Sequence, residues 1–195
     1  MNDTSVAIPV TDGFEQVEMV CPRAALESVD ATTKIISSKH GKVEGFNHDV
    51  GADQFDVDLS FDEAYLQDFD AVLLLGGRLN AQQIRSIPEM QRMVQGMQQD
   101  DKPISIICHA TWLLVSAGLA NGRTLTNWPT LPDDILNAGG NWVDQEVVVD
   151  RKLISSRKPD DIPAFSRKIV ETLAQRVKES VRGTQNEQAE VGASS

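Results

Sequence analysis

The sequence is poor in cysteine, since only Cys21 and Cys108 occur among its 195 residues. Two thiols cannot form a disulfide framework or a zinc site built on several cysteines, so neither device stabilises the fold. A thiol stays free most readily in a reducing compartment. We therefore expect a cytoplasmic protein that holds no metal and no cofactor.

Long apolar runs and an excess of positive charge are also missing. No stretch reaches the roughly 18 consecutive apolar residues that a membrane-spanning helix needs. The first residues, Met1 to Ser5, lack the basic and apolar segments of a secretory signal. A formal net charge of −11 repels nucleic-acid phosphates and anionic lipids. We expect a protein that binds neither nucleic acid nor membrane.

Apolar strand-like runs alternate with helix-like segments along most of the chain. This length can bury one core, so we predict one domain over residues 1–181 and a disordered tail over residues 182–195. The alternation is typical of a three-layer α/β/α sandwich with a mainly parallel sheet. The sequence predicts strands over 5–10, 32–38, 71–75 and 104–107, irregular or short extended pieces over 45–58, a hairpin over 147–154, and helices over 88–97, 133–138 and 160–181.

A further helix is predicted to begin near Glu15. Asp12 and Glu15 have the spacing of a capping box, in which side chains satisfy the first N–H groups of a helix. A buried stripe at intervals of three to four residues follows, formed by Val17, Val20, Cys21 and Ala24. In this interpretation Cys21 is a core residue.

Cys108 stands between a predicted strand and a predicted helix. The run Ile104 to Ile107 is short enough for a buried parallel strand, and Trp112 lies in the helical segment after it. A strand that turns directly into a helix holds the turn residue beside free N–H groups, which favour a thiolate. The pattern indicates a nucleophile, and the alternative is an inert core thiol, because free cysteine is among the most buried residue types.

Gly76 and Gly77 follow the predicted strand 71–75. Glycines let the backbone approach a ligand and expose N–H groups, as an oxyanion hole requires. A simple tight turn is the alternative. Ligands of open α/β sheets bind beyond the carboxyl ends of the strands, so we expect the glycine pair and Cys108 to form one site.

A series of short motifs runs in order through about residues 5–178: Asp12 to Glu15, Gly76 to Arg78, Ile107 to His109, Ala117 to Leu119, Gly122 to Pro129, Asp133-Asp134, Asn137 to Gly139, Trp142 to Asp144, Glu146 to Asp150 and Ser155 to Arg157. Together they resemble the PfpI/ThiJ family of intracellular cysteine hydrolases. The resemblance implies a flavodoxin-like fold, related to class I glutamine amidotransferases, with a nucleophilic cysteine on a strand-to-helix elbow.

The resemblance also implies roles for the matched residues. Cys108 would be the nucleophile, His109 its neighbouring histidine and Glu15 the acid that contacts the thiol. The N–H of Gly76 or Gly77, with that of His109, would form the oxyanion site. Adjacent side chains at a turn tend to diverge, so the His109 ring is open to a structural or a catalytic role. Glu15 could instead be a helix cap.

The sequence departs from the family pattern near the site. Family proteases orient the histidine with a glutamate from a neighbouring subunit, and this chain has Gln82 and Gln83 in that region. A neutral amide cannot stabilise an imidazolium as a carboxylate does, which disfavours proteolysis. Ala110 and Thr111 replace the usual glycine and proline after the histidine.

Three classes of function remain open. The first is a cysteine-dependent stress enzyme acting on a small-molecule carbonyl or a peptide, either a peptidase or amidase, or a glyoxalase or deglycase forming a hemithioacetal on Cys108. The second is a redox sensor in which Cys108 is oxidised, and the third a chaperone-like scaffold in which it is dispensable. We favour the first, and the resemblance implies a homodimer or a hexamer of dimers.

Overall fold

A seven-stranded sheet forms the centre of the computed structural model, which describes residues 1 and 3–193, with the backbone alone for 180–193. The strand order is β11-β12-β8-β7-β1-β3-β6, and the neighbours are parallel except for the antiparallel hairpin β11–β12. This confirms the predicted mainly parallel sheet. The strands are β1 (Ser5–Pro9), β3 (Thr32–Ser37), β6 (Leu59–Ser60), β7 (Ala71–Leu74), β8 (Ile104–Ile107), β11 (Val147–Asp150) and β12 (Leu153–Ser156).

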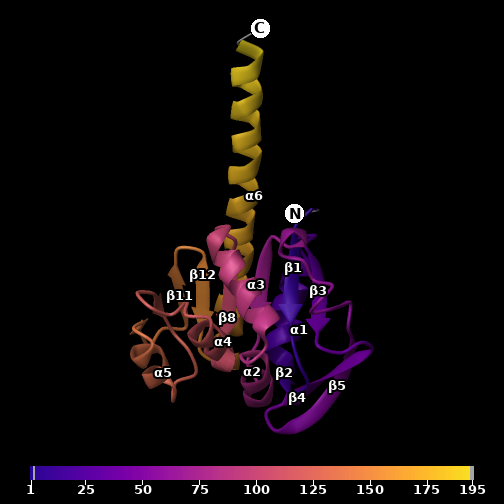
Figure 1. Cartoon of the computed structure of the whole chain (residues 1–195), viewed down its shortest axis with the longest axis vertical. Helices are drawn as coiled ribbons and strands as arrows, with labels where there is room; N and C mark the ends of the chain where they lie inside the picture. Colours follow the sequence, from indigo (N-terminus) through magenta and orange to yellow (C-terminus); the bar gives the residue numbers. More distant parts are fainter. Residues whose placement is uncertain (2, 194–195) are drawn as a thin grey trace.

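Helices cover both faces of this sheet (Figure 1). Alternate strand residues point to opposite faces, so Ile8 packs in one core with Phe165, whereas Ala7 packs in the other with Met93. The result is the predicted three-layer α/β/α sandwich. Its helices are α1 (Gln16–Glu27) and α6 (Ile162–Ala193) on the first face, α3 (Pro88–Gln99), α4 (Thr111–Ser116) and α5 (Pro132–Asn137) on the second, and α2 (Arg78–Ile84) after β7, with 3₁₀ turns at η1 (Leu66–Asp68), η2 (Cys108–Ala110) and η3 (Pro159–Asp161).

The strongest apolar patterns of the sequence form the inner elements. β7 and β8 are buried along their whole length, because helices cover them on both sides. α3 begins with Pro88 in its first turn, where a missing N–H costs nothing. The predicted helix is thus confirmed, and its buried residues are Met90, Met93, Val94 and Met97.

Residues 45–58, predicted as irregular or short extended pieces, form most of a hairpin. β4 (Lys42–Asn47) and β5 (Val50–Asp56) are antiparallel, and β4 also pairs with the short β2 (Phe14–Glu15). Only a few side chains of the hairpin pack inward, such as Phe55, whose ring centroid lies 5.7 Å from that of Phe14. The other side chains are mostly polar and solvent-facing, which hid the two-residue period. A second small sheet joins β9 (Thr124–Leu125) to β10 (Asn141–Trp142).

The start of α1 differs from its prediction in two ways. The Asp12 carboxylate accepts a hydrogen bond from the Glu44 N–H at 2.9 Å and from Lys39 Nζ at 2.6 Å, so the capping box does not form. The buried side of the helix is also turned from the predicted stripe, and Cys21 is exposed. The residues buried on α1 are Glu18, Met19, Pro22 and Leu26.

α6 is longer than expected, because the helix continues to Ala193 where we predicted a disordered tail from residue 182. Figure 1 shows its last turns projecting beyond the rest of the domain. Buried contacts of the helix include Phe165, Ile169 and Leu173. Beyond them the sequence is rich in Arg, Gln, Glu and Ala, which have high helix propensity. Among the described residues, no helix has the length and apolarity needed to cross a membrane.

Candidate active site

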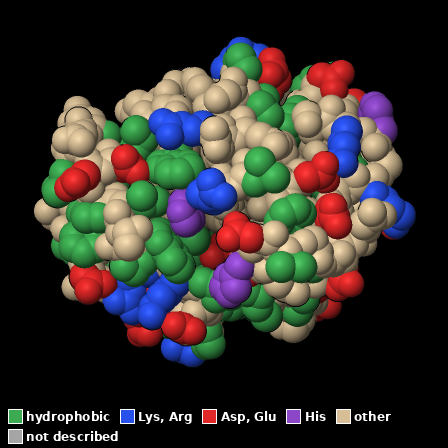
Figure 2. Space-filling model, turned by 90° about the horizontal axis from the view of Figure 1, so that it is seen from below, with side chains coloured by type: hydrophobic (Ala, Val, Ile, Leu, Met, Phe, Trp, Pro, Cys, Tyr) green, Lys and Arg blue, Asp and Glu red, His purple; other side chains and the backbone are tan. Residues whose placement is uncertain are grey.

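The carboxyl ends of β7 and β8 lie side by side, because the two strands are parallel neighbours. They reach the edge of the sheet that is lowest in Figure 1 and faces the viewer in Figure 2. Figure 2 shows imidazole, cationic and carboxylate side chains gathered near the middle of this face, beside a hydrophobic area. The predicted site residues therefore meet at one edge of the sheet, as expected for an open α/β fold.

Cys108 occupies the predicted elbow, directly after β8 and at the start of η2. Its backbone φ is +61°, in the left-handed region that non-glycine residues avoid at a cost of about 1–3 kcal/mol. The residue is only 5% exposed. The backbone N–H groups of His109 and Gly77 face its sulfur and lower the pKa of the thiol. The tight turn thus aims two backbone donors at the thiol.

Gly76 and Gly77 have different roles, although the sequence analysis assigned the oxyanion N–H to either one. The Gly77 N–H faces the sulfur, whereas the Gly76 N–H donates to Glu18 Oε2 at 2.7 Å and is not free to bind an oxyanion. Gly76 is instead needed for close approach, because a Cβ there would lie 2.7 Å from Cys108 Cβ. Of the expected glycine donors, Gly77 is the one available to a substrate oxygen.

Replacing Gly77 with alanine is expected to destabilise the fold by about 3 kcal/mol. Gly77 has φ +80°, and an added Cβ would overlap backbone atoms, including Glu15 N at 2.7 Å and Phe14 Cα at 2.8 Å. Gly118→Ala is the matched control, because Gly118 has φ +73° and open space around it, so only about 1 kcal/mol is expected. Urea unfolding of both variants measures the difference. Equal losses would contradict the steric argument.

The acid beside the thiol is Glu18, and not Glu15 as the resemblance implied. Glu15 is the extended residue before α1, and its Oε2 accepts the His48 N–H at 3.0 Å, at the turn of the β4–β5 hairpin. Glu18 lies in the first turn of α1, is fully buried, and its carboxyl group faces the Cys108 thiol. A signal for Glu18 existed in the sequence. It is an acidic residue on the inward face of a helix, but our stripe was out of phase with that face.

Burial sets the protonation of the Glu18–Cys108 pair. It raises the pKa of Glu18 to about 8, so this carboxyl group is mostly neutral at pH 7. Glu18 Oε1 makes no hydrogen bond to the described residues, as suits an oxygen that can carry the proton. Burial and then a charged Glu18 raise the pKa of Cys108, while the N–H groups of His109 and Gly77 lower it. We expected a thiolate from these donors alone, but burial outweighs them.

The His109 ring lies beside the thiol rather than diverging from it. Its Nδ1 is 3.0 Å from Cys108 Sγ. Burial and the Arg78 charge lower the pKa of the imidazole, and the Asp134 charge raises it in part. A neutral imidazole at this distance can accept the thiol proton.

Asn80 supports the site and was missed by the sequence analysis. Its Oδ1 accepts the Thr11 N–H at 2.8 Å, and its Nδ2 donates to the carbonyls of Leu75 and Gly76 at 2.9 and 3.1 Å. The fully buried amide thereby ties the loop after β1 to the glycine pair. Nothing in its sequence context distinguishes it from a surface asparagine.

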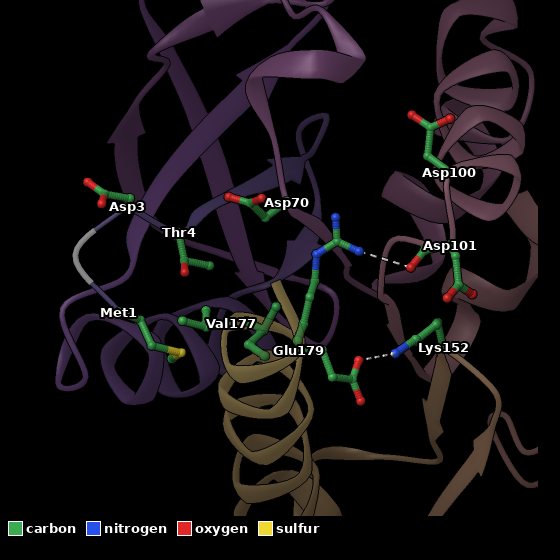
Figure 3. Close-up of a pocket in the computed structure, with 11 residues that line it drawn as sticks. Met1, Asp3, Thr4, Asp70, Asp100, Asp101, Lys152, Val177 and Glu179 are labelled. Carbon is green, nitrogen blue, oxygen red and sulfur yellow. Dashed lines mark hydrogen bonds and ion pairs between the residues drawn. The ribbon is translucent and has the colours of Figure 1, made fainter. Parts of the chain in front are cut away.

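A separate cavity of about 520 Å³ lies at the opposite end of the sheet, where β1, β7, β8 and β12 begin (Figure 3). It lies against α6, whose Arg176 donates to the Asp101 carbonyl at 3.0 Å across it. Its lining includes none of the predicted site residues. Among the described residues, no group of three or more His, Cys, Asp or Glu side chains is placed to hold a metal ion.

Comparisons with known proteins agree with the fold. The model of the DJ-1/PfpI family matches residues 4–172. A deglycase of Thermococcus kodakarensis is 38% identical over 168 residues, which are 86% of this chain and 98% of the relative. General stress protein 18 of Bacillus subtilis is 36% identical over 83% of this chain and 93% of its own. The crystal structure of Drosophila melanogaster DJ-1beta superposes with a TM-score of 0.80 at 26% identity, covering 94% of this chain and 98% of that one. The chain belongs to the DJ-1/PfpI family.

Proposed function

We propose that this chain is a cysteine-dependent enzyme that converts small α-oxoaldehydes, with Cys108 as the nucleophile. The observation that carries the proposal is the 3.0 Å contact between Cys108 Sγ and His109 Nδ1, next to the N–H groups of Gly77 and His109. A base and two oxyanion donors around one sulfur are the parts that addition to a carbonyl requires. The name of the Thermococcus relative, a deglycase, supports a carbonyl substrate.

The first step is addition of the sulfur to the aldehyde carbon. The thiol proton passes to His109 Nδ1, and the carbonyl oxygen becomes an oxyanion that accepts hydrogen bonds from the N–H groups of Gly77 and His109. Return of the proton to that oxygen gives a hemithioacetal on Cys108. Because Glu18 is neutral, no second negative charge lies beside the sulfur during this step.

The second step moves hydrogen within the bound substrate and needs no external oxidant. His109 removes the aldehyde hydrogen as a proton, the electron pair reduces the neighbouring ketone, and the proton returns to that carbon. The aldehyde carbon is thereby oxidised to a thioester and the ketone reduced to an alcohol. Water then hydrolyses the thioester, releasing a 2-hydroxy acid and restoring the thiol.

Amide hydrolysis is less well supported than α-oxoaldehyde conversion. It requires a histidinium that protonates a poor leaving amine, and such a cation is usually stabilised by a carboxylate. Gln82 and Gln83 are exposed on α2, and neither supplies a carboxylate.

Redox sensing is the second candidate function, favoured by the position of Glu18. A neutral carboxyl group beside the sulfur can donate a hydrogen bond to a sulfinate oxygen, and would so stabilise the oxidised cysteine. In this role peroxide would add two oxygens to Cys108 and the protein would turn over no substrate.

The test is an assay of the purified protein with methylglyoxal and phenylglyoxal, following the 2-hydroxy acid product. We expect turnover of both aldehydes, loss of turnover after alkylation of Cys108, and no cleavage of peptide amide substrates. Release of amine from the peptides without conversion of the aldehydes would overturn the proposal in favour of a peptidase. Inertness to both, with a 32 Da gain at Cys108 from two equivalents of peroxide (about a twofold molar amount), would favour the redox sensor.

A further inference from the structure

Trp112 is held in place from two sides. Its Nε1–H donates to Asp134 Oδ2 at 2.6 Å, which joins α4 to α5. The guanidinium of Arg85 lies 5.5 Å from the centre of the indole ring, and Arg85 Nε itself donates to Ser116 Oγ at 2.9 Å. An indole with its N–H bonded to a carboxylate and a cation on its ring has one preferred orientation.

This fixed ring contacts the His109 imidazole. The two ring centroids are 5.2 Å apart with an interplanar angle of 78°, an edge-to-face geometry. Trp128 stacks on the imidazole at 5.6 Å and 24°, and its backbone N–H donates to the Cys108 carbonyl at 3.4 Å. The imidazole is therefore confined by two indoles while its Nδ1 faces the thiol at 3.0 Å.

The residues whose side chains are described contain no acid hydrogen-bonded to the His109 ring. Asp134 is the carboxylate that acts on it, and its hydrogen bond goes to Trp112 instead. In cysteine and serine hydrolases the histidine is usually oriented by a direct bond to an acid or amide. Here the Asp134 carboxylate binds the Trp112 indole, and the indole in turn contacts the His109 imidazole.

We propose that Trp112, anchored by Asp134, is the positioning residue that holds His109 toward Cys108. The histidine is thus oriented within a single chain, by aromatic contact rather than by an acid from another subunit. The inference rests on the proposed function for its catalytic meaning. The geometry it concerns, the imidazole against the thiol, is measurable without turnover.

Asp134 has two effects that must be separated, because it anchors Trp112 and its charge also faces His109. The other charged groups near the imidazole and the thiol are Arg78 on α2 and Glu18 on α1. Asp134→Asn removes the charge but keeps an oxygen that can accept the Trp112 N–H. Asp134→Ala removes both, and Trp112→Phe keeps the charge but loses the anchored ring.

The experiment measures the rate of Cys108 alkylation by iodoacetamide from pH 5 to 9, read peptide by peptide, with the exposed Cys21 as internal reference. The pKa of His109 is followed by NMR in the same variants. We expect Trp112→Phe and Asp134→Ala each to slow Cys108 about tenfold, and the double variant to be no slower than either. Asp134→Asn should stay within about twofold of the wild type in rate and lower the pKa of His109.

Three outcomes would overturn the positioning role: a wild-type rate in Trp112→Phe, additive losses in the double variant, or an equal loss in Asp134→Asn. Thermal unfolding of each variant separates a misfolded protein from a displaced histidine, and unchanged reactivity of Cys21 excludes a general effect. The proposed function is judged separately. If the wild type converts no aldehyde but the alkylation pattern is as expected, the enzyme assignment fails and the positioning inference stands.

Discussion

Cys108→Ala is expected to lower kcat/KM for α-oxoaldehydes by at least about a thousandfold. The substitution removes the only group in the site that can form a covalent bond to the aldehyde carbon in the proposed sequence. It leaves the N–H groups of Gly77 and His109 in place, so residual binding without chemistry is the expected state. Steady-state kinetics with methylglyoxal measure the loss, and mass spectrometry of the acid-quenched protein tests for the absent thioester adduct.

Cys21→Ala is the control for this comparison. Cys21 is exposed on α1 and takes no part in the site, so its replacement should leave kcat/KM within about twofold of the wild type. Full activity in Cys108→Ala would refute Cys108 as the nucleophile. Partial loss in both variants would instead indicate contamination or general damage by the aldehyde.

Glu18→Gln is expected to change how stability depends on pH. The pKa of Glu18 is about 8 in the folded protein and 4.5 in its ordinary state. A carboxyl group whose pKa is raised on folding binds more protons in the folded state than in the unfolded state. Its stabilising contribution is therefore present at low pH and is lost as pH rises from 4.5 toward 8. Glutamine does not titrate. The free energy of unfolding of Glu18→Gln should therefore increase, relative to that of the wild type, by about 3 kcal/mol between pH 5 and pH 8.

Urea unfolding at pH 5, 6.5 and 8 measures this gain. The value at pH 5 serves as the reference, because both side chains are neutral in the folded protein at that pH. A constant difference across the three pH values would show that Glu18 titrates at its ordinary pKa. A second readout is the alkylation of Cys108 above pH 8, which should be faster in Glu18→Gln because the adjacent carboxylate charge is gone.

The parts of the fold that the sequence predicted best are those in which burial dictates every residue. β7 and β8 lie between two helix layers, so their sequences are apolar throughout and need no partner to be recognised. The elbow followed from the change of pattern at Cys108. The two glycines could be placed at the site because parallel neighbouring strands end at the same edge.

Glu18 was missed because local and tertiary patterns conflict on α1. Val17 and Val20 suggested one helix face, but the helix packs with Met19 and Leu26 inward. Pro22 contributes to this, since a ring without an N–H is tolerated against the core. The shift of face brings Glu18 inward and turns Cys21 out. The rotation of α1 about its own axis depends on contacts with α6 and the sheet, and a local sequence pattern carries no information about those contacts.

The orientation of His109 was equally inaccessible from the sequence. It depends on two indoles, one from α4 and one from the segment after β9, and on a carboxylate from α5. These groups are separated by up to 25 residues along the chain and meet only in the folded protein. The motifs around Trp128 and Asp134 marked the family but gave no hint that they converge on the imidazole.

The left-handed backbone conformation of Cys108 makes catalytic activity and thermal stability conflicting requirements. At φ +61° the residue that the fold itself prefers is glycine, which would relieve about 1 kcal/mol or more of strain. A laboratory selection that rewards only survival at high temperature would therefore enrich inert proteins lacking the thiol. Cysteine is retained under heat selection only if each round also selects for catalytic activity. Screens for more thermostable variants of this chain must therefore select for stability and activity together.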